Sequence, residues 1–271
     1  MKSSLYLKLI LLSTVGVLSI FGYAHGHTFT SDEDASFLSL MDDIKSIILL
    51  IESSNENSTL VTEYANNASM LLNSSTMNEI NERNQRLGTT LTSAITELRN
   101  ASREIKDDEV VMIQDLIDDI ISSRIEKSDL ENATIQSLAI SLDLNKIIEY
   151  YSKAYYTDGF KMNMSGHSMM KEMHSLNTSL TVNLTGTHKD NNTLYNIRSY
   201  YRALSLANVT TERFNADVKE NLNLKDAEFL DKVIIDLKTK LNEKSTINEI
   251  SGIIHGQLQP TLQKIFKLAL G

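Results

Sequence analysis

Glycine and proline are almost absent from the first half of this chain. Between His27 and Asp158 there is one glycine, Gly88, and no proline. Because these two residues end or break helices more than any others, long uninterrupted helices are the expected structure. The sequence therefore predicts an all-α fold, built either as an antiparallel helical bundle or as stacked helical hairpins.

Apolar residues at helical spacing divide the first half into five expected helices. Their stripes are Phe37, Met41, Ile44, Ile47 and Ile51; Leu60, Tyr64, Ala68 and Leu72; Ile80, Leu87, Leu91, Ile95 and Leu98; Val110, Ile113, Ile117 and Ile120; and Ile135, Leu138, Leu142, Ile147, Tyr151 and Tyr155.

Local start and stop signals place several helix ends. Thr76 with Glu79, Ser128 with Glu131, and Thr246 with Glu249 have the spacing of capping boxes. In the second half we expect helices over 194–207, 211–222 and 226–241, and a last one from Thr246. Pro260 lies inside that last stripe and is expected to kink or split the helix.

One long segment interrupts the helical pattern. It contains three glycines and no apolar stripe apart from its methionines. We therefore expect four regions: a signal peptide (1–24), an N-terminal helical half (25–156), a Met/His-rich loop (157–191) and a C-terminal helical half (192–271).

The Met/His-rich loop concentrates soft metal ligands. Its stretch 159–174 holds five of the ten methionines and two of the six histidines: Met162, Met164, His167, Met169, Met170, Met173 and His174. Thioether sulfur favours Cu(I), and imidazole accepts either copper oxidation state. The expected cofactor is therefore copper. The other interpretation is a pliable apolar cover over the helical core, because methionine fills irregular gaps.

The N-terminus predicts export. Lys2 and Lys8 precede a short apolar stretch, and small residues at Gly22 and Ala24 fit a cleavage site, as in a secretory signal peptide. An uncleaved anchor, which would hold the protein at a membrane, is the alternative. Cleavage after Ala24 would leave His25 and His27 near a free amine, a nitrogen set that suits Cu(II).

Composition agrees with an extracytoplasmic location, either secreted or in the cell envelope. The chain has no cysteine, and removal of Lys2 and Lys8 would change its formal charge from −9 to −11. Such acidity argues against nucleic-acid partners. Ten Asn-x-Ser/Thr sequons predict N-glycosylation, although an Asn-, Ser- and Thr-rich chain would also contain some. They are Asn57, Asn67, Asn73, Asn100, Asn132, Asn163, Asn177, Asn183, Asn191 and Asn208.

Residue patterns of catalysis are not found. The chain lacks a His-Glu-x-x-His pair, a Gly-x-Ser-x-Gly turn and a phosphate-binding glycine loop. We therefore expect a protein that is not an enzyme. His255 is interpreted as a hydrogen-bonded core residue, and Gly252 and Gly256 as a site of close helix packing. Met41 and His255 are residue types that can hold a haem, but nothing else in the sequence supports a haem site.

Four stretches carry a resemblance to known proteins: residues 27–33 (HTFTSDE), 79–84 (EINERN), the Met/Asn stretch 160–173, and His255 with Pro260. They resemble a group of exported, cysteine-free helical proteins of ammonia-oxidising archaea. The resemblance implies an extracytoplasmic protein in organisms that use copper enzymes outside the membrane. The expected partner is accordingly another copper protein or a component of the envelope. A fainter similarity to the helical extracytoplasmic domains of iron permeases lacks the acidic metal-binding motifs of those domains.

Overall fold

The computed structural model describes residues 31–54, 56–101, 105, 107–155 and 194–268. Within these ranges the chain forms helices joined by short turns and contains no strand, so the predicted all-α class is confirmed. The α-helices are α2 (Ser31–Ser53), α3 (Ser58–Leu71), α4 (Ser74–Asn100), α5 (Asp107–Arg124), α6 (Lys127–Leu130), α7 (Ala133–Tyr155), α9 (Ile197–Arg213), α10 (Leu224–Asn242), α11 (Ile247–Ile253) and α12 (Gln259–Phe266). Two π-helical turns, η2 (Phe214–Val218) and η4 (Ile254–Leu258), and a 3₁₀ turn, η3 (Lys219–Asn221), complete them.

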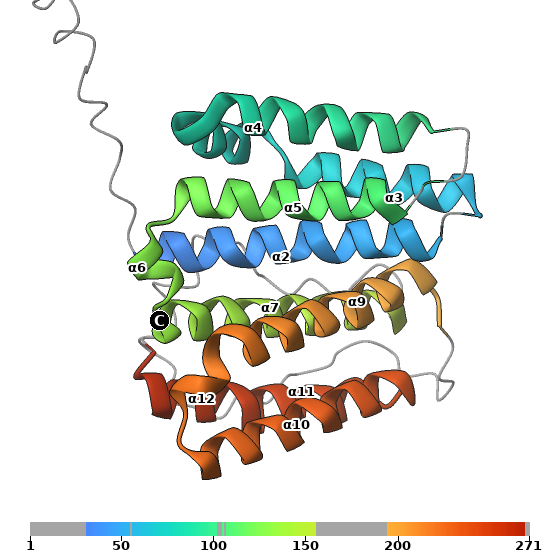
Figure 1. Cartoon of the computed structure of the whole chain (residues 1–271). Coiled ribbons are helices and arrows are strands. Elements are labelled where there is room, and N and C mark those ends of the chain that lie inside the picture. Colours follow the sequence, from blue (N-terminus) through green and yellow to red (C-terminus); the bar gives the residue numbers. More distant parts are fainter. Residues whose placement is uncertain (1–30, 55, 102–104, 106, 156–193, 269–271) are drawn as a thin grey trace, which may run out of the picture.

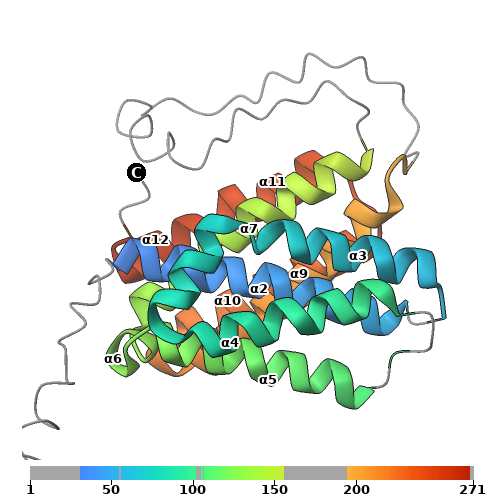
Figure 2. The same cartoon turned by 90° about the horizontal axis from the view of Figure 1, so that it is seen from above.

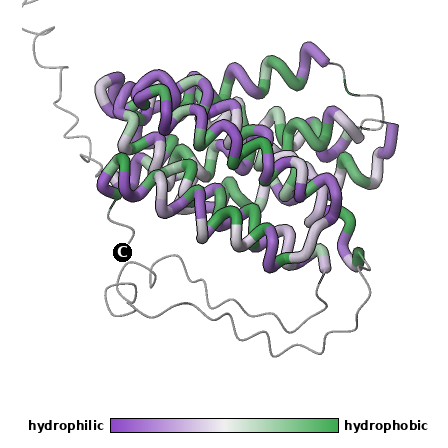
Figure 3. Tube along the Cα trace, turned by 90° about the horizontal axis from the view of Figure 1, so that it is seen from below, coloured by the Kyte–Doolittle hydropathy of each residue, from purple (hydrophilic) through white to green (hydrophobic). Residues whose placement is uncertain are grey.

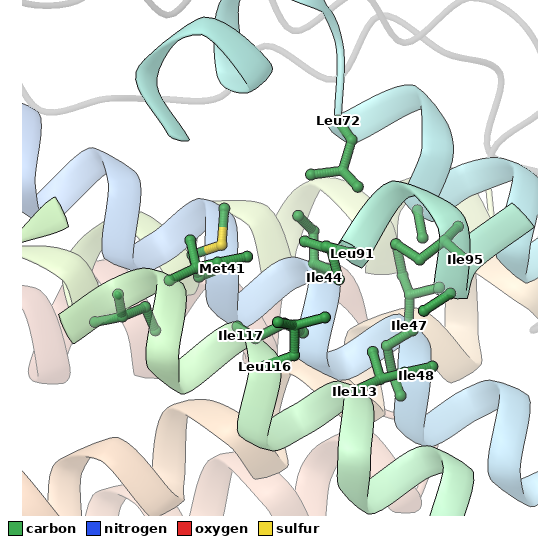
Figure 4. Close-up of a cluster of buried hydrophobic side chains, with 14 of the residues drawn as sticks. Met41, Ile44, Ile47, Ile48, Leu72, Leu91, Ile95, Ile113, Leu116 and Ile117 are labelled. Atoms are coloured by element: carbon green, nitrogen blue, oxygen red, sulfur yellow. The ribbon is translucent and has the colours of Figure 1, made fainter. Parts of the chain in front are cut away.

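Helices α2 to α5 form a first four-helix bundle. Consecutive helices pack against each other in alternating directions, and α5 returns to pack against α2 (Figure 1). Its core is made by the predicted apolar stripes. Residues that meet in the core include Met41, Ile44, Ile47 and Ile48 of α2, Leu91 and Ile95 of α4, and Ile113, Leu116 and Ile117 of α5 (Figure 4).

Helices α7, α9, α10 and the α11–η4–α12 helix form a second four-helix bundle. α7 packs against α9, α9 against α10, and α10 against α11, while α11 and α12 close the bundle against α7. Its core contains Leu206, Leu230, Ile250 and Ile254, none of which exposes any surface. Along these helices hydrophobic and hydrophilic residues alternate, as expected of amphipathic helices (Figure 3).

The two bundles meet where α2 packs against α7 and α9. The long helices of both bundles run roughly along one direction, as the view from above shows (Figure 2). α2 and α7 are therefore covered on most sides, and both bury polar as well as apolar residues. We call this contact between α2, α7 and α9 the bundle junction.

Two of the three predicted capping boxes are wrong. α4 begins after Asn73, whose Oδ1 accepts hydrogen bonds from the backbone amides of Ser75 and Thr76. Thr76 itself is buried, and its hydroxyl donates to the carbonyl oxygen of Leu71. α7 begins after Asn132, whose Oδ1 accepts from Thr134. An asparagine just upstream thus caps both helices, and only the Thr246–Glu249 box is confirmed.

Helix continuity also differs from expectation in three places. The expected helices 194–207 and 211–222 form one continuous helix, because residues 208–210 include neither glycine nor proline. Asn84 has non-helical angles (φ −155°, ψ 87°) and kinks α4, which was expected to be one straight helix. Pro260 does not divide the last helix in two: α11 continues through the π-helical turn η4 into α12, with right-handed helical angles at Ile254, Leu258 and Gln259.

Candidate functional site

All nine predicted copper ligands lie outside the described residues. They are His25, His27, Met162, Met164, His167, Met169, Met170, Met173 and His174. The structure does define where the chain leaves and re-enters the framework around the Met/His-rich loop. The backbone amides of Tyr195 and Asn196 donate to the carbonyl oxygen of Ala154 at 2.8 Å and 3.1 Å. The end of α7 and the residues that precede α9 therefore lie side by side.

Tyrosines surround this point. The ring centroids of Tyr151 and Tyr155 are 4.9 Å apart, those of Tyr151 and Tyr200 6.2 Å, and those of Tyr200 and Tyr201 5.6 Å. The Tyr151 hydroxyl donates to the carbonyl oxygen of Ser245 at 2.5 Å, and the Tyr200 hydroxyl to that of Leu241 at 3.0 Å. Burial raises the pKa of Tyr151 and of Tyr200, so both stay neutral donors. These bonds fasten α7 and α9 to the end of α10 and the turn that follows it.

The bundle junction holds a buried charge network that the sequence analysis missed. Its first member is Asp42 of α2, which exposes 1% of its surface. Arg213 of α9 binds it through two hydrogen bonds, from Nε to Oδ2 at 2.5 Å and from Nη2 to Oδ1 at 2.6 Å. The remaining terminal nitrogen of Arg213, Nη1, donates to Oε1 of Gln136 on α7 at 2.5 Å. One guanidinium thus joins all three helices of the junction.

A second pair lies next to the first. Nη2 of Arg202 on α9 is 3.0 Å from both carboxylate oxygens of Asp43, and the Tyr150 hydroxyl donates to Oδ2 of Asp43 at 2.6 Å. The Arg202 guanidinium also lies 4.1 Å from the centroid of the Tyr150 ring. Burial, followed by the negative charge of Asp43, raises the pKa of Tyr150 and keeps it a neutral donor.

The third carboxylate of the junction is Asp143 on α7. Ser39 of α2 contacts its Oδ1 through Oγ at 2.6 Å, and the carbonyl oxygen of Ser39 accepts from Nζ of Lys146 at 2.8 Å. Asp42 and Asp43 sit directly beside Met41 and Ile44 of the predicted stripe. An acidic pair within an otherwise apolar helix was the feature of the sequence that could have predicted this site.

His255 and its neighbours correct two further expectations. His255 is exposed rather than buried, and its Nδ1 lies 2.6 Å from Oε1 of Gln259. It lies on the second bundle, whereas Met41 is fully buried in the core of the first, so the structure does not bring the two together. A Cβ added at Gly252 or Gly256 would meet no atom within 4 Å. Neither glycine therefore serves close helix packing.

Six of the ten sequons lie in the described residues. Asn57, Asn73, Asn100, Asn132 and Asn208 are exposed, and Asn67 is half-buried. Asn57, like Asn73, caps its helix through Oδ1. Capping uses Oδ1 and does not involve the amide nitrogen, the atom that would carry a glycan. The remaining four, Asn163, Asn177, Asn183 and Asn191, lie outside the described residues.

Among the described residues no group of three or more His, Cys, Asp or Glu side chains is arranged to hold a metal ion. In that same part of the chain, no helix combines the length and the apolar character that crossing a membrane requires. Comparison of the chain with protein-family models, curated proteins and solved structures finds no match.

Proposed function

We propose that this chain is an exported, non-enzymatic helical protein that binds or buffers copper through the Met/His-rich loop. The ligands would be drawn from Met162, Met164, His167, Met169, Met170, Met173 and His174. Thioether and imidazole donors in this density suit copper better than any hard cation. Its partner would be another copper protein or a component of the cell envelope.

One structural observation supports copper binding over the apolar-cover interpretation. In the second bundle α7 and α9 pack directly together, and hydrogen bonds to the carbonyl oxygen of Ala154 join the end of α7 to Tyr195 and Asn196, which precede α9. Leu206, Leu230, Ile250 and Ile254 pack with other described residues in the core of this bundle and expose no surface. Helices that pack together in this way have less need of a separate apolar cover, and this supports the copper interpretation of the loop.

A multiple variant tests the proposal. Met162, Met164 and Met169 are replaced by Ser and His167 by Ala in the full chain, followed by Cu(I) titration and thermal unfolding. We expect weaker Cu(I) binding with an unchanged melting temperature. The matched control replaces Met70 and Met112, which are 75% and 56% exposed on the framework, and should keep full copper affinity. A lower melting temperature, with no Cu(I) binding by the parent, would instead show that the loop is a cover.

A second copper site is proposed at the mature N-terminus. Its nitrogen set requires removal of the signal peptide, so protein sequencing of the exported form should begin at His25. That form should then show a visible Cu(II) band typical of nitrogen ligation, and the band should be absent from His27→Ala. A mature chain that begins beyond His27 would exclude the site and leave the loop proposal standing.

Export and glycosylation form part of the same proposal. Five described sequons place their asparagines on the surface, which is where attached glycans must lie. Mass spectrometry of glycopeptides from the native protein measures which of the ten sites carry sugar. A native protein without glycans at any site would contradict this part.

A structural or interaction role in the envelope, without a metal, is the second candidate. The observation that favours it is an open groove of about 410 Å³ between the C-terminal part of α2, α9 and α10. Leu49, Leu50, Tyr201 and Leu204 line it together with polar residues, and Tyr201 is 46% exposed. Exposed aromatic and aliphatic side chains with polar neighbours are typical of contact surfaces. The copper titration above distinguishes the two candidates.

A further inference from the structure

The bundle junction contains one more buried acid than its arginines neutralise. Asp42, Asp43 and Asp143 are each at most 1% exposed. Arg213 forms a two-bond pair with Asp42, and Arg202 pairs with Asp43. Neither guanidinium forms a hydrogen bond to Asp143. A buried ionised carboxylate is costly unless a cation and several donors stabilise it.

Asp143 has few such stabilising groups. It exposes no surface, its Oδ1 contacts Ser39 Oγ, and its Oδ2 has no hydrogen-bond partner. The charged groups that act on it are Asp42 from α2, Arg213 from α9 and Lys146 from its own helix. Arg213 is shared with Asp42 and with Asp217 of η2, whose carboxylate is 3.7 Å away. Lys146 directs its ammonium to the backbone of Ser39.

We propose that Asp143 is a proton-binding site of the folded protein and that its bound proton stabilises the bundle junction. As a neutral acid, Asp143 needs fewer partners than a carboxylate does. The contact with Ser39 serves both forms, because a hydroxyl donates to a carboxylate and accepts from an acid. Loss of the proton leaves an ionised group beside Asp42, and it weakens the packing of α2 on α7.

The electrostatics of the site agree with this geometry. Burial is the main cause that raises the pKa of Asp143 well above its ordinary value of 3.8, and the negative charge of Asp42 adds to it. Lys146, the Ser39 hydroxyl and Arg213 act in the opposite direction and are weaker. In the unfolded chain Asp143 ionises near pH 3.8. Ionisation of Asp143 therefore does not affect the free energy of unfolding below that pH. As the pH rises further, the free energy of unfolding falls, and it stops falling once the pH exceeds the pKa of Asp143 in the folded protein.

The test compares the full-length parent with Asp143→Asn from pH 3.8 to alkaline pH. Asparagine has the shape of the neutral acid and cannot ionise. We expect equal melting temperatures at the acidic end and a growing advantage of the asparagine variant as the pH rises. The control, Asp115→Asn on the exposed side of α5, should keep the parent's pH profile. Parallel curves for parent and Asp143→Asn would overturn the proposal.

Infrared spectroscopy detects the protonated form of Asp143 in the parent, independently of how well the variant folds. In a pH titration of the parent, the C=O stretching band of a protonated carboxylic acid should persist above the pH range in which exposed aspartates ionise, and Asp143→Asn should lack this persistent band. If the parent loses its carboxylic-acid band over the same pH range as the exposed aspartates, Asp143 does not retain its proton and the proposal fails. Limited proteolysis reports on the junction: cleavage near α6, between α5 and α7, should increase at alkaline pH in the parent more than in the variant.

Discussion

Arg213 binds Asp42 across the bundle junction through two hydrogen bonds, of 2.5 Å and 2.6 Å. The two residues are 171 positions apart and lie on α9 and α2. Asp42 exposes 1% of its surface, and the Arg213 side chain 9%. Such a pair contributes little net stability compared with apolar residues of the same shape, but removal of one member leaves an uncompensated buried charge. The pair joins α9 of the second bundle to α2 of the first.

Replacing Arg213 by Met should destabilise the protein by about 3–5 kcal/mol, because Asp42 remains buried without its partner. Urea unfolding measures the change. The double variant Asp42→Leu with Arg213→Met should recover most of the loss, since it removes both charges. A single variant as stable as the parent would contradict the buried pairing.

Truncation of core residues tests the first bundle. Leu91 and Ile117 expose no surface, as their positions in the apolar stripes predict. Leu91→Ala or Ile117→Ala should cost about 2–5 kcal/mol, from lost burial and the cavity left behind. Ile235 is 64% exposed on α10, and Ile235→Ala should change stability by less than about 0.5 kcal/mol. Equal effects at buried and exposed positions in chemical denaturation would refute the helix packing.

The start of α4 offers a test of the cap. Asn73→Ala removes the acceptor for the amides of Ser75 and Thr76 and should cost about 0.5–2 kcal/mol. Asn73→Ser keeps an N-cap oxygen and should lose only a small part of that. The parent and both variants are produced in a host that does not glycosylate proteins, so that loss of the sequon cannot change stability through a missing glycan. If the alanine and serine variants are equally stable, Asn73 is not the cap.

The cap of α11 predicts a pH effect opposite in sign to that of Asp143. Hydrogen bonds from the Thr246 backbone and side chain lower the pKa of Glu249 below its ordinary value of 4.5. Its contribution is therefore present above pH 4.5 and is lost as the pH falls through the folded pKa. Glu249→Gln should remove this acidic part of the stability profile, measured by thermal unfolding. An unchanged profile would mean that the capping box is not formed in solution.

Local sequence predicted most of the helical framework. The stripes of α2 and α5 are buried as expected. Both lie in the part of the chain that has one glycine and no proline, where apolar side chains repeating every 3.6 residues favour a helix packed on its apolar face. Short-range capping was less predictable. Asn73 and Thr76 both offer an oxygen to the start of α4, and packing decides between them by burying Thr76.

The ligand types of the Met/His-rich loop and of the motif at His25 and His27 could also be inferred from the sequence alone. Copper binding at each of these two places remains a proposal. Tertiary structure alone decided the bundle junction. Periodicity marks Asp42 and Asp43 only as acids beside an apolar stripe, and Arg202 and Arg213 only as cations on a later helix. Whether a buried carboxylate is paired depends on which distant helix packs over it. The contact of α2 with α9 gives cations to Asp42 and Asp43, while the contact of α2 with α7 gives Asp143 a serine hydroxyl. The different hydrogen-bond and ion-pair partners of the three carboxyl groups follow from that packing.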